Sequence, residues 1–394
     1  MTAEPVIDLT DPATAVERLI EAGRRGPTAT DATTGMLIVL GYDEVVRLAH
    51  DRRMAGVGLN VFDMMGVQGP LREWYGELMF TNEGESHGRL RRLVSRAFTP
   101  RSIEQLRPFT RESVEKSFAT VCADGQGDLA EVFARLGTRV MCELLGVPQE
   151  DVPVFAGWAD ALSRIFGYMD ADQIAAAADA LEELLRYTDD LVARRDDEPA
   201  DDLITALLAA EHDGDKLSRH EVVTMVSNLL VAAHDTTASQ LACSLLTLLR
   251  HPEALERVRN REVTPGHALT ETMRFEPAIP AFPRTATAPV EIAAVERPAG
   301  TVTLLTVASA NRDAGVYADP DRLAVDRFQD DGVPSPISFG TGPHYCLGAN
   351  LARMAMEETI SGLAESRLRL RGDAGGIEWR AVLGRGPVNI PVVV

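Results

Sequence analysis

The segment SFGTGPHYCLGANLAR, residues 338–353, places a single cysteine in a glycine-rich loop just ahead of a helical pattern. Three glycines in the segment permit backbone conformations and close approaches that are closed to other residues; they are Gly340, Gly342 and Gly348. Cys346 lies where the following helix is predicted to begin, near Leu347. A thiolate there would gain from the helix dipole and from free backbone N–H groups. The loop is therefore predicted to present a sulfur atom from a tightly shaped backbone.

Three roles are open for this cysteine: an inert core residue, a nucleophile or a metal ligand. The other cysteines are Cys122, Cys142 and Cys243. Their scatter indicates neither a disulfide framework nor a cysteine-rich zinc site, and it fits a reducing cytoplasm. Zinc would need more ligands than Cys346 and His344 can supply, and a nucleophile would need a general base that the sequence does not identify. Haem iron is the one common metal group for which a single thiolate is sufficient.

Length and composition describe an ordinary globular protein. The chain has 394 residues, of which 45% are hydrophobic and 25% charged, and its net charge is −20. This acidity argues against general nucleic-acid binding, because neutralising phosphates needs positive surface. The first residues carry no hydrophobic signal segment, and no apolar run approaches the roughly 18 residues of a membrane-spanning helix. We expect a soluble, cytoplasmic protein without a membrane segment.

Periodicity predicts a mainly helical fold with a small β portion. Helical patterns cover residues 12–24, 43–50, 86–98, 101–118, 127–145, 171–195, 201–212, 218–250, 252–260 and 266–275. Strand-like stretches cover residues 36–40, 290–294, 301–309 and 388–394. No repeat or low-complexity linker divides the chain. We therefore expect residues 1–394 to form a single α-rich domain.

The longest predicted helix covers residues 218–250. Ser218 and Glu221 form an S-x-x-E capping box at its start, and Pro252 bars its continuation. At 1.5 Å a residue it would be about 45–50 Å long, enough to cross the molecule. Apolar residues surround it on several faces, which indicates a buried helix.

A polar block interrupts this buried helix; it consists of His234, Asp235, Thr236 and Thr237. In one interpretation the threonines bond back to carbonyls one turn earlier and Asp235 meets a basic partner, which offsets the cost of burying its charge. In the other, Asp235 and Thr236 are an acid and an alcohol that deliver protons to a cavity. His234 is expected to face away from that cavity as a structural residue.

The segment HGRLRRLVSRAF, residues 87–98, carries positive charge on two faces of a predicted helix. His87 and Arg91 share one face with Val94 and Phe98, where apolar residues would be expected. Such an inward pair suits a buried anion. The opposite face carries Arg89, Arg92 and Arg96. This face forms either a local basic patch or an ordinary solvated surface.

These features together resemble the cytochromes P-450. The cysteine-ligand signature F-x-x-G-x-H-x-C-x-G is matched by Phe339, Gly342, His344, Cys346 and Gly348, and it continues into LAR at residues 351–353. The family's E-x-x-R signature is matched by Glu271 and Arg274 in ETMR, a pair that by itself would suggest only a surface ion pair. The third member of that structural triad would be Arg327 in LAVDRF, although Leu323 and Val325 replace the usual Phe and Pro.

The resemblance implies a triangular, single-domain P-450 fold with a long central helix on the distal side of a buried haem b. Cys346 would supply the axial thiolate, whose electron donation favours O–O cleavage. The haem propionates would be met by His87, Arg91, Arg284 and His344. Phe339 would shield the thiolate. Further haem contacts would come from Gly340, Gly348, Ala232 and Ala233.

The block AAHDTT, residues 232–237, resembles the family's distal motif. Asp235 and Thr236 would relay protons to dioxygen, which favours oxygen activation over a peroxide-driven variant. Ala233 stands where glycine is usual, and glycine there eases the local opening of the helix. Alanine at this position is therefore expected to affect the geometry of the groove that the opened helix would form for oxygen.

The resemblance also implies the substrate contacts. The segments that supply them in the family here contribute Phe62, Met65, Trp74, Met79, Phe166, Tyr168, Val231, Ala232, Ile279, Ala281 and Phe282. Nearly all are apolar, and they include the methionines Met65 and Met79. We expect a bulky, largely hydrophobic small-molecule substrate and some plasticity of the pocket.

The implied function is a monooxygenase that hydroxylates or epoxidises such a substrate, as in natural-product tailoring. The alternatives are a P-450 that carries out a non-insertion oxidation, such as aryl coupling, ring formation or rearrangement, or a haem-thiolate sensor without turnover. A monomer with a ferredoxin and ferredoxin reductase as partners is expected. Because ferredoxins are generally acidic, the expected docking patch consists of Arg89, Arg92, Arg96 and Arg353.

Overall fold

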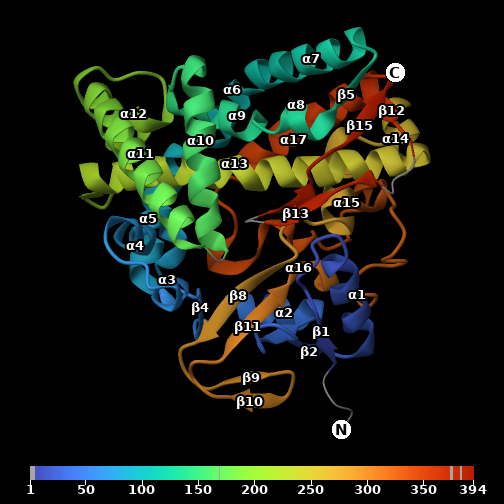
Figure 1. The fold of residues 1–394 in the computed structure, drawn as a ribbon, viewed down its shortest axis with the longest axis horizontal. Helices are drawn as coiled ribbons and strands as arrows, with labels where there is room; N and C mark the ends of the chain where they lie inside the picture. The colour runs from blue at the N-terminus through green and yellow to red at the C-terminus, as the bar shows by residue number, and fades with distance from the viewer. Residues whose placement is uncertain (1–4, 168, 373–375, 382–383) are drawn as a thin grey trace.

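The computed structural model describes residues 5–167, 169–372, 376–381 and 384–394, apart from the side chains at positions 61 and 64. The helices are α1 (Ala15–Arg25), α2 (Tyr42–His50), α3 (Asn60–Met65), α4 (Pro70–Glu77), α5 (Gly84–Ala97), α6 (Pro100–Gln105), α7 (Arg107–Ala123), α8 (Leu129–Phe133), α9 (Leu136–Leu145), α10 (Val152–Ser163), α11 (Ala171–Asp197), α12 (Leu203–Ala209), α13 (Arg219–Arg250), α14 (Pro252–Arg259), α15 (Pro265–Phe275), α16 (Val307–Ala310) and α17 (Ala349–Glu365). The described strands are β1 (Val6–Ile7), β2 (Thr28–Asp31), β3 (Leu37–Val39), β4 (Met54–Ala55), β5 (Gln126–Asp128), β6 (Glu211–His212), β7 (Asp215–Lys216), β8 (Ala281–Ala286), β9 (Val290–Ile292), β10 (Val295–Arg297), β11 (Val302–Thr306), β12 (Arg369–Leu370), β13 (Trp379–Ala381), β14 (Arg385–Pro387) and β15 (Pro391–Val393). The prediction of a mainly helical fold with small sheets is confirmed (Figure 1).

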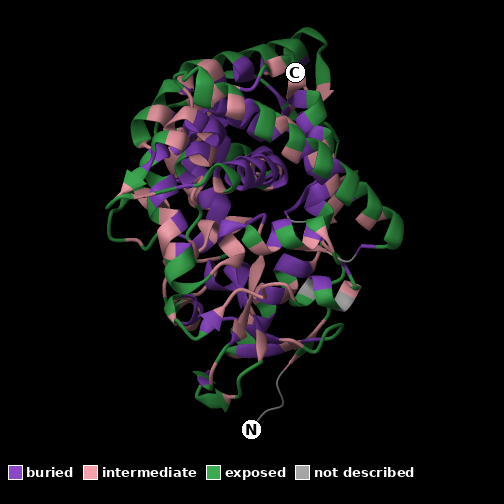
Figure 2. Cartoon of the chain, turned by 90° about the vertical axis from the view of Figure 1, so that its left-hand side faces the viewer, coloured by how far each residue is buried: buried purple, intermediate pink, exposed green. Residues whose placement is uncertain are grey.

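Helix α13 crosses the molecule and organises the helical part (Figure 1). It is 32 residues long, and its capping box is formed as predicted: Ser218 Oγ accepts from the Glu221 N–H, while the Glu221 carboxylate accepts from the Ser218 N–H. Helices α9, α10 and α11 pack along it on one side, and α15 and β14 contact it elsewhere. Figure 2 looks along the helix and shows its turns buried within the surrounding chain. A cavity beside α13 is therefore bounded by a rigid, buried wall.

A six-stranded mixed sheet forms the part of the molecule below α13 in Figure 1. Its order is β1-β2-β3-β11-β8-β4, so it joins strands from the N-terminal region with strands that follow α15. The pairs β1–β2 and β3–β11 are parallel, and the other pairs are antiparallel. Strand β8 brings Arg284 into register with Thr303. The sheet thus places β8, which carries Arg284, next to the helical part.

Strand β8 is absent from the sequence prediction because Pro283 lies at its centre, and proline lacks the N–H that a paired strand uses. In the structure Pro283 faces Leu304 of β11, whereas β4 pairs only with Thr285 and Ala286. At Pro283, β4 therefore does not pair with β8. Because no N–H is needed on that edge, β8 tolerates a proline there although it is an interior strand of the sheet.

Several predicted helices are wrong in extent. The prediction for 101–118 divides into α6 and α7, because Pro108 is tolerated in the first turn of a new helix but not inside a continuous one. The prediction for 127–145 begins two residues too early, because Asp128 ends β5 and caps α8 by accepting from the Ala130 N–H, and it divides between α8 and α9. The strand predicted for 301–309 ends at Thr306 and continues as α16. Helices α3, α4 and α10 were not predicted.

Candidate functional site

The cysteine loop is shaped by backbone contacts. The Cys346 N–H donates to the Phe339 carbonyl at 3.0 Å, and the Tyr345 N–H donates to the Gly342 carbonyl at 3.1 Å. Gly342 has φ +76°, and a Cβ at this position would lie 2.6 Å from the Ala49 carbonyl oxygen of α2. Both the conformation and the space therefore require glycine at position 342. Helix α17 begins at Ala349 with Gly348 as its N-cap, slightly later than predicted.

The thiol of this loop opens into a cavity of about 410 Å³ between α13 and α17. The cavity is lined from the cysteine loop by Phe339, Gly340, His344, Cys346 and Gly348, from α13 by Asn228, Ala232, Ala233, Thr236 and Thr237, from α5 by His87 and Arg91, and from β8 by Phe282 and Arg284. Residues that are far apart in the chain thus meet around one space. Cys346 and the two threonines of the polar block, Thr236 and Thr237, line the same cavity.

The surroundings of Cys346 act on its ionisation in two directions. Burial raises the pKa of the Cys346 thiol, while the Gly348 N–H and the positive charges of Arg91 and Arg353 lower it. The same N–H and cations would stabilise a negatively charged sulfur. In the described part of the chain no three His, Cys, Asp or Glu side chains cluster around a possible metal ion. A zinc-type site therefore does not explain the cysteine.

Two arginines of the cavity wall lack a carboxylate partner. Among the described residues neither Arg91 nor Arg284 has an acidic side chain within ion-pair distance. The Arg284 guanidinium donates to its neighbour's carbonyl, that of Pro283, at 2.9 Å and lies over the Phe282 ring. Burial lowers the pKa of both arginines. An anion would stabilise these partly buried cations, so the wall fits a ligand that brings its own carboxylates.

Two histidines stand beside these arginines. The rings of His87 and His344 have their centroids 4.2 Å apart. His344 Nε2 lies 3.0 Å from the Glu83 carboxylate, which also accepts from the Gly56 N–H. Burial lowers the pKa of His87 to about 4, and the nearby His344 and Arg91 act in the same direction. His87 is therefore neutral at pH 7 and can serve as a hydrogen-bond donor to an anion.

Two residues of the polar block of α13, Thr236 and Asp235, make contacts that the first of its two interpretations predicts. The Thr236 hydroxyl lines the cavity and donates to the Ala232 carbonyl at 2.7 Å. The Asp235 carboxylate is buried; it pairs with Arg380 at 3.0 Å and accepts from the Gly384 N–H at 2.9 Å. Helix α13 is α-helical throughout, including Ala233. The acid thus points toward the C-terminal strands, and the alcohol points toward the cavity wall.

His234 faces away from the cavity, as expected. Its ring is buried between Thr138 of α9, 2.7 Å from Nδ1, and Asp160 of α10, 2.9 Å from Nε2. Both ring nitrogens are therefore engaged by neighbouring helices. The contacts tie α9 and α10 to α13 at the level of the polar block.

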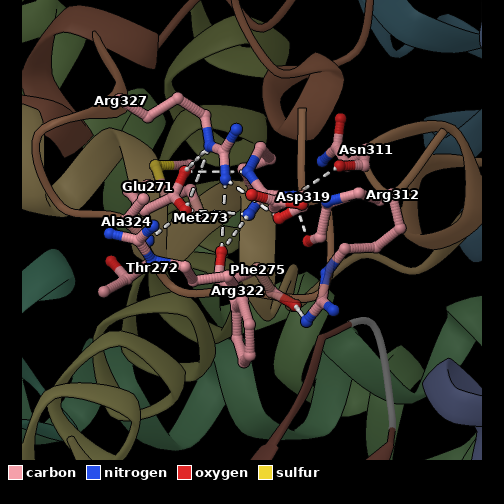
Figure 3. A network of polar contacts seen from close by, with 12 residues as sticks. Glu271, Thr272, Met273, Phe275, Asn311, Arg312, Asp319, Arg322, Ala324 and Arg327 are labelled. Atoms are coloured by element: carbon pink, nitrogen blue, oxygen red, sulfur yellow. Dashed lines mark hydrogen bonds and ion pairs between the residues drawn. The ribbon is translucent and has the colours of Figure 1, made fainter. Parts of the chain in front are cut away.

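Glu271, Arg274 and Arg327 meet in a buried ion cluster (Figure 3). Glu271 accepts two 2.8 Å bonds from Arg274, and both side chains are fully buried. Arg327 Nε lies 3.2 Å from the same carboxylate. The remaining donors of Arg274 reach the backbone carbonyls of Asn311, Pro320 and Arg322. The interpretation as a surface ion pair is therefore wrong.

This cluster is connected to the start of the cysteine loop. The Asn311 amide donates to Ser338 Oγ at 2.9 Å and accepts from the Ile337 N–H at 2.9 Å. The Ser338 hydroxyl donates in turn to the Met273 carbonyl, inside α15. The chain segment that Arg274 holds therefore also holds the residues that lead into the loop.

The expected basic face of α5 needs a correction. Arg89 pairs with both Asp215 and Glu221, and Arg96 donates to the Glu211 carbonyl. Both are used to hold β6, β7 and the start of α13 against α5. Arg92 is exposed, and Arg353 lies over the Phe339 ring with its guanidinium 5.0 Å from the centroid. Of the three α5 arginines, Arg89 is neutralised by two carboxylates. Arg96 keeps its charge at the surface but is held by a carbonyl of the fold, and Arg92 is exposed.

The predicted substrate contacts divide into two groups. Met79, Ala232, Ile279 and Phe282 line the cavity. The others that the structure describes do not line it; they are Phe62, Met65, Trp74, Phe166, Val231 and Ala281. Phe62 packs on Tyr75, and Trp74 donates to Ser227, so both are core residues. Tyr168 lies outside the described residues.

Sequence reasoning missed several cavity residues, among them Phe80, Val140, Met141, Asn228, Leu229 and Gln240. One signal could have found two of them. Asn228, Ala232, Thr236 and Gln240 recur every four residues and so share one helical face. Polar side chains on a shared face of an otherwise apolar buried helix indicate a face that borders a cavity.

The site therefore combines one thiol, a polar distal helix and unpaired cations around an apolar space. This is the donor set that an iron porphyrin with carboxylate side chains requires. The model of the family "Cytochrome P-450" matches residues 155–264 and 266–363, more than half of the chain. The chain belongs to the cytochrome P-450 family and is a cytochrome P-450 monooxygenase.

Known relatives agree with this assignment. The chain is 34% identical to luteothin monooxygenase of Streptomyces thioluteus, with 98% of this chain and 95% of the relative covered. It is 38% identical to mycinamicin IV hydroxylase/epoxidase of Micromonospora griseorubida, with 78% and 77% covered. The crystal structure of CalO2 superimposes with a TM-score of 0.88 at 29% identity and covers 97% of this chain and 96% of that one. Among the described residues, no helix has the length and apolar character needed to cross a membrane.

Proposed function

We propose that this enzyme inserts one atom of dioxygen into a largely apolar organic substrate, by hydroxylation or epoxidation, in the tailoring of a natural product. The observation that carries the proposal is the Cys346 thiol, which opens to the same cavity as Thr236. Several relatives are named for the oxygenation of natural products, which supports this class of substrate. Substrate, dioxygen, two electrons and two protons would give the oxygenated product and water. Residues 1–394 would act as a single catalytic domain.

In this proposal the protein holds haem b through its own side chains. Cys346 would bind the iron, and His87, Arg91, Arg284 and His344 would bind the two carboxylates of the porphyrin. Phe339, Gly340, Gly348, Ala232 and Ala233 would contact the ring. When bound, the haem supplies the activation of dioxygen. The buried triad of Glu271, Arg274 and Arg327 would maintain the loop that presents the sulfur.

Protons would reach the cavity through α13. The hydroxyl of Thr236 holds a proton at the cavity wall, where its present acceptor is the Ala232 carbonyl. Asp235 is the adjacent acid, and its partner Arg380 is partly exposed to solvent. Release of the Arg380 pair would free the Asp235 carboxylate to pass a proton from solvent toward Thr236.

Electrons would come from a ferredoxin and its reductase. Of the four arginines expected to dock that acidic partner, Arg89 and Arg96 are engaged within the fold. The docking surface is therefore proposed to rely on Arg92, together with Arg353 near the cysteine loop. Salt should weaken such docking, because exposed charges are screened.

The experiment that tests this function combines binding with product analysis. The haem-loaded enzyme is titrated with a library of natural products and steroids, and binding is followed by the spin-state change of the ferric iron. Each binder is then incubated with ferredoxin, reductase and oxygen-18-labelled dioxygen. We expect a product that carries one labelled oxygen atom. Binders that are oxidised without labelled oxygen would contradict oxygen insertion.

Replacement of the alcohol and the acid of α13 should separate electron use from product formation. Thr236→Val keeps the side-chain shape and Asp235→Asn keeps the backbone hydrogen bond, but each removes a proton-transfer group. We expect product formation to fall by about 100-fold while reductant is still consumed. Thr237→Val, at the adjacent position of the same wall, is the matched control. Equal product yields in all three variants would contradict the proton route.

A further inference from the structure

Asn228 is a polar residue in the wall of the cavity. It lies on α13, is only 7% exposed and lines the cavity. Among the described residues its amide makes no hydrogen bond. The amide atoms are not among the inaccessible side-chain atoms without a partner, so they face the open space of the cavity. The amide is therefore available to a hydrogen-bonding group that a ligand brings into the cavity.

The other amide on this face of α13 behaves differently. Gln240 accepts from the Ala278 N–H at 2.9 Å and donates to the Glu276 carbonyl at 3.2 Å. Its role is to hold the chain that follows α15 against the helix. Asn228 has no comparable contact, so the fold does not account for its polarity.

The position of Asn228 on α13 sets its distance along the helix from Ala232 and Thr236, which line the same cavity. It precedes Ala232 by one turn and Thr236 by two, which corresponds to about 6 Å and 12 Å along the helix axis. The wall between them is apolar; Leu229 and Met141 line the same cavity. A ligand that reached both ends would thus have an apolar body and one polar group.

The chemistry of the wall indicates that this group is neutral. The charged and ionisable groups that line the cavity are His87, Arg91, Arg284, His344, Tyr345 and Cys346, which come from α5, β8 and the cysteine loop rather than from α13. A charged substrate group at Asn228 would be desolvated without a counter-ion, which is costly. An amide can donate to a carbonyl or accept from a hydroxyl.

We propose that Asn228 is a substrate-recognition residue that binds a neutral carbonyl or hydroxyl group of an otherwise apolar substrate, one to two helical turns along α13 from Ala232 and Thr236. The inference rests on the proposed function, because it takes the cavity as the substrate site of a haem enzyme. It adds a polar requirement to a pocket that the other contacts describe as hydrophobic. Substrates that lack such a group would leave the amide unpaired and bind more weakly.

The test uses imidazoles that bind the haem iron directly, so that the natural substrate need not be known. A series of 1-(ω-hydroxyalkyl)imidazoles with tails of increasing length is compared with 1-alkylimidazoles of the same number of heavy atoms. Dissociation constants are measured from the shift of the haem absorption band in the wild type and in Asn228→Leu. At the best-placed tail length, we expect the preference for hydroxyl over methyl to be about fivefold greater in the wild type.

Two controls separate recognition from shape. Met141→Leu changes the same cavity without changing its polarity, and it should leave the hydroxyl preference as in the wild type. Asn228→Ser keeps a hydrogen-bonding group and should retain part of the preference, and it replaces Asn228→Leu if that variant does not take up haem. An equal hydroxyl preference in the wild type and in Asn228→Leu at every tail length would overturn the proposal. A wild type that gives no absorption shift with any imidazole would instead overturn the proposed haem function, and this inference with it.

Discussion

Cys346→Ser is expected to abolish monooxygenase activity while leaving the polypeptide folded. Loss of an outer-shell partner of a metal ligand typically costs 10–100-fold in affinity or activity. Removal of the ligand itself should therefore cost more than about 100-fold. The fold does not depend on the thiol, because the loop is held by the Cys346 N–H bond to the Phe339 carbonyl and by Gly342. The measurements are product formation and the absorption spectrum of the reduced carbon monoxide complex, which reports a thiolate ligand.

Another cysteine of the chain supplies the matched control. Cys122 is exposed, and Cys122→Ser makes the same atomic change at the end of α7. This variant should keep both the spectrum and the activity of the wild type. The assignment of Cys346 as the iron ligand would be wrong if the two serine variants gave the same spectrum and the same turnover.

Arg274→Ala is expected to cost about 3–5 kcal/mol of unfolding free energy, because it breaks a buried charge pair and leaves one partner behind. Glu271 would keep only Arg327, and the carbonyls of Asn311 and Pro320 would lose their donor. A loss of that size is a large part of the 5–15 kcal/mol that stabilises a typical domain, so poor expression is also expected. The measurement is the free energy of unfolding in urea, at a fixed level of haem loading.

An exposed ion pair serves as the comparison for this buried one. Glu21 and Arg25 pair on the surface of α1, and Arg25→Ala should change the free energy of unfolding by less than about 1 kcal/mol. The expected contrast comes from burial, since both pairs join an arginine to a glutamate within one helical turn. If Arg274→Ala cost no more than Arg25→Ala, the triad would not be a structural element of this fold.

Local signals explain how much of the fold could be predicted. The boundaries of α13 agree to one residue with the predicted helix, because its capping box and Pro252 lie at its ends. The prediction failed where partners are remote. Strand β8 was not predicted because it contains Pro283, and it forms only because β11 pairs with it. The helix predicted over 127–145 is wrong at its start, where residues 127 and 128 belong to β5, which pairs with β15 near the other end of the chain.

The candidate site was predictable to a similar extent. The cysteine loop, the E-x-x-R pair and the polar block are short motifs, and the structure places their residues around or next to one cavity. The substrate contacts expected from longer segments were predicted less accurately. Phe62 and Trp74 pack in the core instead of lining the cavity, and Asn228, which lines it, was not predicted. A segment shows that residues are near the pocket, but not which side chains turn toward it.

The sequence by itself determined the mainly helical class, the central buried helix and the solitary thiol at the start of α17, because each depends on residues that are close together in the chain. Only the tertiary structure decided the electrostatic state of the side chains. Arg89 is neutralised by Asp215, 126 residues away, and Asp235 is held by Arg380 of β13. It also decided that the fold uses the amide of Gln240, whereas the amide of Asn228 has no hydrogen-bond partner within the described part of the chain. The physical reason is that a charge or an amide acquires its role from the partners that the fold brings to it, and those partners lie on other elements.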